Sequence, residues 1–283
     1  AYRQEKDGST YGGFYSQEQI KEVVSYAKER GVAVVPEIEL PGHSLAALAA
    51  YPQYSCTGGP FEVETDWGVF KEIYCAGNEQ TFTFIKNILD EVIELFPAEY
   101  IHIGGDEVPK YRWERCSKCK KRMMEESLED VHELQSYFIQ RIETYLSRKG
   151  KKLIGWDEIL EGEIASGVTV QSWRGMKGAA KAAKSGHDAI VSPTSHAYFD
   201  YDLDAIDLRK VYYFDPIPEG LTKEEEKHIL GGECNMWSEY APQDMVDSKV
   251  FPRLLAMSEV LWTAPEQKDY ASFYNRVQDH YSR

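Results

Sequence analysis

Two adjacent carboxylates, Asp106 and Glu107, end the segment Ile-His-Ile-Gly-Gly-Asp-Glu at residues 101–107. The apolar residues before them predict a β-strand, and the two glycines let a ligand or another backbone come close at the strand's end. Four tryptophans follow at the ends of later predicted strands or turns: Trp113, Trp156, Trp173 and Trp237. Carboxylates beside aromatic rings suit a sugar, because a pyranose has apolar faces to stack and hydroxyls to bind. The pattern favours a carbohydrate site over a solvated acidic pair in a loop.

The segment at 101–107 also closely resembles the signature of glycoside hydrolase family 20, the β-N-acetylhexosaminidases. Six further segments resemble the family and follow in the family's order: 36–43, 155–158, 171–173, 198–200, 237–239 and 251–253. One such match would be weak evidence, whereas seven in register are strong. The resemblance implies a (β/α)8 TIM-barrel fold and exo-acting hydrolysis of terminal non-reducing N-acetyl-β-D-hexosamine, either GlcNAc or GalNAc. The implied partner is an N-acetylhexosamine-containing oligosaccharide or glycoconjugate.

The resemblance also implies a mechanism for the acidic pair. Adjacent residues cannot stand on opposite sides of a scissile bond as acid and nucleophile, and this family is a substrate-assisted exception to the two-carboxylate scheme. The substrate's own 2-acetamido carbonyl would attack the anomeric carbon and give an oxazolinium intermediate with net retention. Glu107 would protonate the leaving oxygen and later activate water. Asp106 would accept the acetamido N–H and stabilise the developing positive charge.

Further positions match the family one at a time. Tyr198 resembles the hydroxyl donor to the acetamido carbonyl, although a core tyrosine is a serious competing interpretation in a chain with 19 of them. Asp200 and Glu239 resemble the groups that bind the 4- and 6-hydroxyls. The pocket would be walled by three of the tryptophans: Trp156, Trp173 and Trp237.

Four residues around the acidic pair have less definite expected roles. His43 resembles a histidine near the acid/base, although a lone histidine is more often structural. His102 is expected to pack or to orient a neighbour. Glu39 stands where the family commonly has aspartate, which leaves its role in doubt. Trp113 is considered for the leaving-group side of the pocket.

Helix and strand signals alternate along the chain, which argues for a parallel sheet wrapped by helices. Strands are predicted at 32–38, 100–103, 152–156, 168–173, 188–192 and 229–237, and helices at 16–30, 79–96, 128–146, before 186, 251–262 and 269–281. A complete barrel has eight strands, so about six of the eight βα units are expected here. By the family comparison, residues 1–15 resemble the loop leaving strand two, and a strand-one Arg and a strand-two Asp are expected to be missing.

Composition sets the outer bounds. The chain has 283 residues, 42% of them hydrophobic, and a formal net charge of −15. The negative charge argues against a nucleic-acid or anionic-membrane partner. No apolar run approaches the roughly 20 residues of a membrane span. There is no signal peptide and the chain starts at Ala1 rather than Met, so we expect a chain that has been processed or cut for expression. We also expect export from the cytoplasm and one N-terminally incomplete catalytic domain over 1–283. A homo-oligomer or a missing N-terminal segment is expected to cover the open edge of the barrel.

The five cysteines give a weaker signal. Cys56 and Cys75 bracket a loop, Cys116 and Cys119 form a single Cys-x-x-Cys, and Cys234 falls in a predicted strand. A zinc site needs four ligands, and no second pair stands near Cys116 and Cys119 in the sequence. The sequence therefore favours a local disulfide or free thiols over metal, and a buried apolar role for Cys234. No cofactor is expected.

Three functions stay open at this point. The first is the exo-acting β-N-acetylhexosaminidase, and the second is a non-catalytic or weakly active glycan-binding remnant with the same pocket. The third is an unrelated barrel hydrolase that uses a metal, which is disfavoured because no ligand set appears at the strand ends. The sequence does not distinguish GlcNAc from GalNAc.

Overall fold

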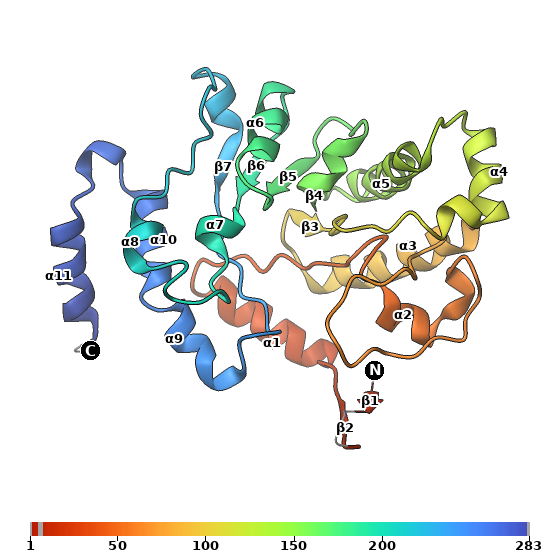
Figure 1. Ribbon diagram of the computed structural model, residues 1–283, viewed down its shortest axis with the longest axis horizontal. Coiled ribbons are helices and arrows are strands. Elements are labelled where there is room, and N and C mark those ends of the chain that lie inside the picture. Colours follow the sequence, from red (N-terminus) through yellow and green to blue (C-terminus); the bar gives the residue numbers. More distant parts are fainter. Residues whose placement is uncertain (1, 5–7, 282–283) are drawn as a thin grey trace. The chain divides into compact units, whose positions relative to one another are not determined.

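The computed structural model describes residues 2–4 and 8–281, and its chain forms two compact units, Ala1–Val168 and Thr169–Arg283 (Figure 1). Each unit is built from parallel strands joined by helices. No helix among the described residues has both the length and the apolar character needed to cross a membrane. The expectation of one catalytic domain over 1–283 stays a prediction.

The first unit opens with a short hairpin and then alternates helices with strands. Its elements are β1 (Tyr2–Gln4), β2 (Thr10–Gly12), α1 (Gln17–Lys28), α2 (Leu45–Ala50), η1 (Pro52–Tyr54), α3 (Glu79–Leu95), β3 (Tyr100–His102), η2 (Trp113–Arg115), α4 (Ser117–Glu125), α5 (Val131–Arg148), β4 (Lys152–Trp156) and η3 (Asp157–Glu161).

Strands β3 and β4 are parallel, with Ile101 opposite Leu153. Residues 36–40 lie along the other side of β3 through an isolated parallel bridge between Glu37 and His102, and Leu40 N–H donates to the Ile103 carbonyl at 2.8 Å. The carboxyl ends of all three segments therefore lie at the same edge.

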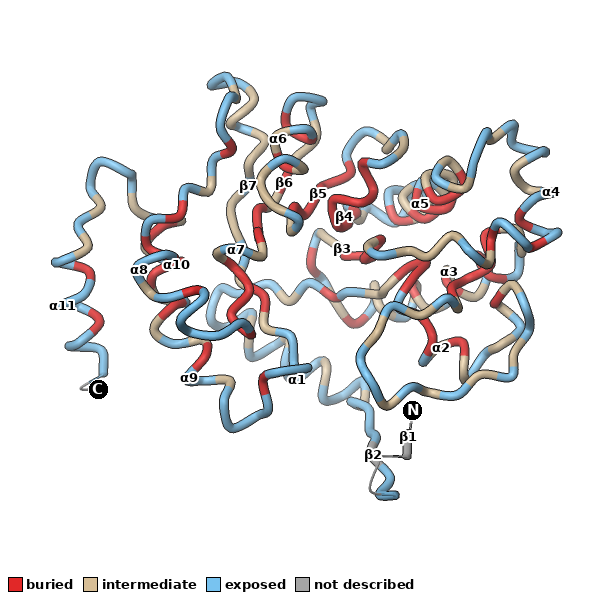
Figure 2. Tube along the Cα trace, in the orientation of Figure 1, coloured by how far each residue is buried: buried red, intermediate tan, exposed pale blue. Residues whose placement is uncertain are grey.

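Helices α3 and α5 cover these strands and supply the core of the first unit. Phe82 of α3 and Phe138 of α5 are fully buried and pack with ring centroids 4.9 Å apart. Each such side chain contributes about 1.5–3 kcal/mol by leaving water. Asn78 caps α3 and Asp130 caps α5 by accepting backbone N–H groups, which explains why both helices begin where they do. Figure 2 shows buried residues along α5.

The predicted strand at 32–38 is wrong in its first half. Helix α1 ends in a left-handed cap, in which Gly31 has φ +71° and Val32 N–H donates to the Ala27 carbonyl at 2.9 Å. That bond closes the helix and uses the backbone that a strand would need. Only the segment from Pro36 onward pairs with β3.

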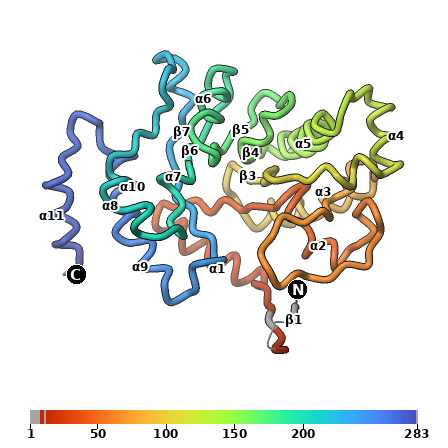
Figure 3. Tube along the Cα trace, in the orientation of Figure 1, coloured from red at the N-terminus to blue at the C-terminus, as the bar shows by residue number. Residues whose placement is uncertain are grey.

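The expected loop at residues 1–15 contains a two-stranded antiparallel hairpin, in which Arg3 pairs with Tyr11. Residues 1 and 5–7 of that expected loop lie outside the described part of the chain. Figure 3 shows the chain order, including the orange segment 51–78, which joins α2 to α3 and contains no strand or α-helix.

The second unit continues the same alternation. Its elements are β5 (Thr169–Ser172), α6 (Lys177–Lys184), β6 (Ala189–Val191), α7 (Thr194–Ala197), α8 (Leu208–Tyr212), η4 (Glu225–His228), β7 (Ile229–Gly232), η5 (Gln243–Met245), α9 (Val246–Val250), α10 (Arg253–Trp262), η6 (Pro265–Gln267) and α11 (Tyr270–Tyr281).

Strands β5, β6 and β7 are parallel neighbours, with Val170 opposite Ala189 and Ile190 opposite Gly231. Helix α6 packs on β5 and β6 through its buried alanines. The predicted strand at 229–237 ends at Gly232, because Asn235 instead pairs with the segment around Tyr198. Cys234 consequently lies beyond the strand and is half-buried rather than buried.

Apolar side chains remain exposed near the start of the first unit. Helix α1 has no buried residue, although its sequence is amphipathic, and Val23 and Val32 are 55% and 58% exposed. Among the described residues, segment 36–40 has backbone hydrogen bonds to β3 on one side only. A sheet edge with apolar neighbours favours association with another chain.

We therefore expect residues 1–283 to self-associate through the edge at 36–40 and the exposed side chains of Val23 and Val32. Val23→Asp and Val32→Asp should weaken association about tenfold or more, since each removes apolar contact of roughly 1.5–3 kcal/mol. Light scattering across a concentration series measures this, with the exposed Val69→Asp as a matched control. A monodisperse, thermally robust wild-type monomer would contradict the expectation.

Candidate active site

The acidic pair follows a backbone turn whose conformation strongly favours glycine. Gly104 and Gly105 follow β3 with φ of +69° and +98°. A Cβ on Gly104 would lie 1.9 Å from Glu39 Oε1, and one on Gly105 would lie 2.8 Å from the Ile159 side chain. Glycine is thus favoured by conformation at both positions, and a side chain there would displace the Glu39 carboxyl group or press on Ile159.

The peptide groups of this turn are held on both sides. Gly105 N–H donates to Glu39 Oε1 at 3.0 Å, and the Gly105 carbonyl accepts from Gln135 Nε2 of α5 at 2.9 Å. Gln135 also contacts Lys110, whose ammonium donates to the Val108 carbonyl at 3.2 Å. Burial lowers the pKa of Lys110 to about 8. These contacts fix the backbone that carries Asp106 and Glu107.

His43, Asp106 and Glu107 form one cluster. The Nε2 atom of His43 lies 3.5 Å from Asp106 Oδ2 and 3.2 Å from Glu107 Oε2. His43 and Glu107 both have positive φ, 42° and 46°, a conformation that non-glycine residues seldom adopt. Such residues gather at functional sites because the surrounding structure must enforce them.

The two oxygens of Asp106 differ in their surroundings. Oδ2 faces His43, whereas Oδ1 is buried and accepts no hydrogen bond from an N–H or hydroxyl group of the described residues. The carboxyl group of Glu39 is hydrogen-bonded to Asp106. A buried acceptor that no N–H group satisfies is a position that a ligand N–H would suit.

His43 is biased towards its charged form. Its hydrogen bond to Asp106 raises the pKa of the imidazole, and the negative charges of Asp106 and Glu107 raise it further against the opposing effect of burial. A protonated His43 donates from Nε2 towards both carboxylates.

Glu39 behaves in the opposite way. Burial and the neighbouring charge of Asp106 raise the pKa of Glu39 to about 10. At neutral pH its carboxyl is therefore protonated, and Glu39 adds no negative charge beside Asp106. The residue whose role the sequence leaves in doubt is a neutral support for the turn.

Trp156 ends β4 and is oriented by two residues of the same unit. Its Nε1–H donates to Glu37 Oε1 at 3.2 Å, and its ring meets the His102 ring edge-on with centroids 4.9 Å apart. His102 Nδ1 lies 3.0 Å from the same Glu37 oxygen. His102 thus orients a neighbour, as the sequence predicts, and Glu37 is an orienting residue that the sequence reasoning missed.

A second cluster lies in the second unit, after the carboxyl ends of β5, β6 and β7. The rings of Trp173 and Tyr198 stack with centroids 6.2 Å apart. Asp200 is buried, and its Oδ1 has no partner among the described residues. Burial raises the pKa of Asp200, with a smaller contribution from the charge of Glu239. Glu239 itself is exposed.

Buried cations hold the backbone of this cluster in place. Lys249 Nζ donates to the Asp200 carbonyl at 2.6 Å, and the fully buried Arg253 guanidinium donates to the carbonyls of Phe199 and Ile206. A hydrogen bond from the Trp237 backbone reaches Asp200. Lys249 carried no sequence signal, because nothing in a run of surface-like residues marks it as buried.

The structure thus gathers the predicted site residues into one cluster in each unit. His43, Asp106, Glu107 and Trp156 belong to the first unit, and Trp173, Tyr198, Asp200, Trp237 and Glu239 to the second. Trp113 does not line a pocket. It is fully buried and donates from Nε1 to the Tyr74 carbonyl at 2.9 Å, so its suggested leaving-group role is wrong.

A profile described as the catalytic domain of glycosyl hydrolase family 20 matches residues 1–265. The chain belongs to glycosyl hydrolase family 20. It is 46% identical over 288 aligned residues to a beta-hexosaminidase of Porphyromonas gingivalis, covering 97% of this chain and 37% of that protein. It is 35% identical to a beta-hexosaminidase of Vibrio furnissii, covering 88% of this chain and 43% of that protein.

Solved structures agree with the family. One, a beta-N-acetylhexosaminidase, superposes with a TM-score of 0.92 at 28% identity and covers 99% of this chain and 63% of that chain. Another, from Bacteroides fragilis NCTC 9343, has a TM-score of 0.84 at 35% identity, covering 95% and 56%. These likenesses confirm the barrel-type α/β fold that the sequence predicts. The chain spans less than half the length of the two curated relatives named above.

The neutral Glu39 predicts a pH-dependent stability. Between a pKa of 4.5 in the unfolded chain and about 10 in the folded one, the unfolded state loses a proton that the folded state keeps, so stability falls as pH rises. Glu39→Gln cannot ionise. The unfolding free energy of this variant should therefore rise relative to that of wild type between about pH 5 and pH 9, by at most about 1.4 kcal/mol per pH unit. Its melting temperature should rise relative to wild type over the same range.

Thermal melts across this range test the expectation, with the exposed Glu62→Gln as a control that should track wild type. A difference between Glu39→Gln and wild type that stays flat with pH would show that Glu39 ionises alike in both states.

Proposed function

We propose that this chain carries the active site of an exo-acting β-N-acetylhexosaminidase. The observation that carries the proposal is the cluster of Asp106, Glu107 and His43, in which the buried Asp106 Oδ1 accepts no hydrogen bond from an N–H group of the described residues. An acetamido N–H is a donor of the kind this acceptor needs. The family membership and the beta-hexosaminidase relatives support the same reaction.

In this proposal the substrate supplies the nucleophile. Asp106 accepts the acetamido N–H, which directs the acetamido carbonyl oxygen to the anomeric carbon, and the C–O bond to the leaving group breaks as the oxazolinium ring forms. Glu107 gives its proton to the leaving oxygen and then removes one from the attacking water. Asp106 stabilises the positive charge of the intermediate. His43 lies within 3.2 Å of Glu107 and positions it.

The second cluster has proposed binding roles. Tyr198 would donate to the acetamido carbonyl, and Asp200 and Glu239 would bind the 4- and 6-hydroxyls. The buried Asp200 Oδ1, without a partner in the described part of the chain, suits a substrate hydroxyl. Trp156, Trp173 and Trp237 would contact the acetamido methyl and the apolar face of the sugar. One solved relative, an exo beta-N-acetylglucosaminidase from Vibrio harveyi with a TM-score of 0.87, is in complex with N-acetylglucosamine.

The proposed substrate is an N-acetylhexosamine-containing oligosaccharide or glycoconjugate. Export from the cytoplasm stays a prediction, as does the cover of the exposed edge near α1 by another chain or segment. The alternative of a glycan-binding protein without turnover is separated from the enzyme by the assays that follow.

Glu107→Gln tests the acid. It removes protonation of the leaving group at nearly constant shape, so turnover of an aryl N-acetyl-β-glucosaminide should fall about 10²- to 10⁴-fold with binding largely kept. The loss should be smallest for aryl groups that leave easily. Glu114→Gln, an exposed glutamate of η2, is the matched control. Unchanged turnover on a poor leaving group would remove Glu107 from the role of acid, and substrate binding without wild-type turnover would favour the binding protein.

Asp106→Asn tests substrate assistance. Asparagine keeps the shape but removes the negative charge, so turnover should fall on the order of 10²-fold or more. Asp244→Asn, in the exposed η5, should leave turnover unchanged. A plain β-glucoside, which lacks the acetamido group, should be a poor substrate for wild type and variant alike. Efficient hydrolysis of that glucoside by wild type would overturn the substrate-assisted mechanism.

A further inference from the structure

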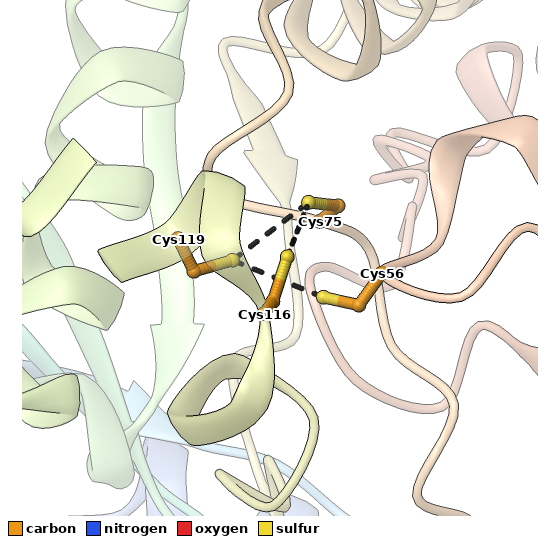
Figure 4. Close-up of side chains that lie close together, drawn as sticks. All are labelled: Cys56, Cys75, Cys116 and Cys119. Carbon is orange, nitrogen blue, oxygen red and sulfur yellow. Dashed lines mark hydrogen bonds between the residues drawn. The ribbon is translucent and has the colours of Figure 1, made fainter. Parts of the chain in front are cut away.

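Four cysteines that lie far apart in the sequence converge in the first unit (Figure 4). Cys56 follows η1, Cys75 precedes α3, and Cys116 and Cys119 stand at the start of α4. The four sulfur atoms all lie within 4.8 Å of one another. The second pair that a metal site needs was hidden in the sequence because Cys75 stands 41 residues before Cys116.

The spacing of the sulfurs matches a tetrahedral metal site. Cys56 and Cys119 are 3.8 Å apart, Cys75 and Cys116 are 3.8 Å apart, and Cys75 and Cys119 are 3.7 Å apart. Zinc bonds sulfur at about 2.3 Å, and a regular tetrahedron with that radius has edges of about 3.8 Å. Three edges therefore already have the required length, and the other three, each at most 4.8 Å, need to shorten by at most about 1 Å.

The contacts do not divide the sulfurs into two disulfide pairs. They run as a chain from Cys56 to Cys119, then to Cys75 and Cys116, so the two middle sulfurs each have two neighbours. All four are free cysteines. A common centre explains this arrangement better than pairwise bonding does.

The backbone is built to bring the four together. An antiparallel bridge joins Ser55 to Tyr74, and Cys75 N–H donates to the Tyr54 carbonyl at 2.8 Å, which sets Cys56 beside Cys75. Gly77 then lets this loop lie against the Cys-x-x-Cys turn, since a Cβ there would be 2.1 Å from the Lys118 carbonyl carbon. The approach is backbone against backbone, so no larger residue fits.

Burial and charge also suit bound thiolates. Cys75 and Cys119 have no exposed surface and Cys116 is 8% exposed. Four thiolates around Zn²⁺ leave a net charge of −2, and the N-terminus of α4 together with its lysines gives compensating positive charge. Arg112 lies near enough to Cys56 to interact with it electrostatically. An all-sulfur set selects a soft or borderline metal over magnesium or calcium.

We propose that Cys56, Cys75, Cys116 and Cys119 bind one Zn²⁺ in a closed, structural site. Binding replaces the thiol protons, which pass to solvent, and involves no oxidation. Four protein ligands leave no open position, so the ion takes no part in the chemistry. The proposal does not depend on the proposed hydrolase activity.

The site would secure the loops that flank the acidic cluster. Tyr74, next to Cys75, donates its N–H to the Pro41 carbonyl at 3.0 Å and accepts from Trp113 Nε1 at 2.9 Å. Pro41 is two residues from His43, which contacts Glu107. Zinc would thus hold segment 51–78 against α4 and, through Tyr74, steady the loop that carries His43.

Metal content tests the proposal directly. The full chain, purified under reducing conditions without chelator, should contain about one zinc per chain by elemental analysis and native mass spectrometry. Cys75→Ser and Cys119→Ser should lose most of this zinc, whereas Cys234→Ser, in the second unit, should keep it. Zinc retained at wild-type level in both cluster variants would overturn the proposal.

A measurement on the wild-type chain covers variants that fail to fold. Titration of the chain with a thiol-modifying reagent, followed with a zinc indicator, should release one zinc as four thiols react. A strong chelator should lower the melting temperature, and added zinc should restore it. Co²⁺ in place of zinc should give the absorption of a tetrahedral thiolate complex. A chain that takes up no metal from added zinc, with these cysteines as free thiols or mapped as disulfides, would refute the site.

Discussion

The site in the first unit depends on one steric constraint, the absence of side chains at Gly104 and Gly105. A Cβ at Gly104 would overlap the Glu39 carboxyl group, and Gly105 must present its N–H to that same carboxyl. Because the chain can turn so tightly there, Asp106 and Glu107 leave the end of β3 facing His43. The positive φ of Glu107 and of His43 is the local cost of this arrangement, and the packed strands and helices around the turn sustain it.

Electrostatics then separates the roles of the acidic groups. Four carboxyl groups, Glu37, Glu39, Asp106 and Glu107, crowd one strand edge, and such crowding would be unfavourable if all were charged. Glu39 avoids the charge by keeping its proton, and Glu37 accepts a hydrogen bond from Trp156. The raised pKa of His43 favours its positively charged form beside Asp106 and Glu107. A neutral Glu39 and a histidine biased towards its charged form thus reduce the repulsion in an acidic site, within a chain that is already strongly negative.

The cysteine cluster meets a different need in the same unit. Segment 51–78 has no strand or α-helix, and backbone hydrogen bonds such as the bridge between Ser55 and Tyr74 hold only part of it, so side chains or a bound ion must help to fix it. Trp113, which the structure places in the core, and Tyr74 form one link to the loop of His43. A zinc site at the other end of that link would make the loop's position independent of its own weak local structure.

The sequence by itself determined the local events. Strand β4 has the bounds the pattern predicts, and the capping box of Ser16 and Gln19 begins α1, because alternation and end caps are properties of neighbouring residues. The family resemblance likewise needed only short motifs, and the comparisons confirm it. Only the tertiary structure decided what distant residues do to one another. It buried Trp113 and Lys249, shortened the strands at 32–38 and 229–237, raised the pKa of Glu39, and brought Cys56 and Cys75 to Cys116 and Cys119. Burial, pKa and ligand geometry depend on which segments meet in space, and no pattern of neighbours in one chain records that.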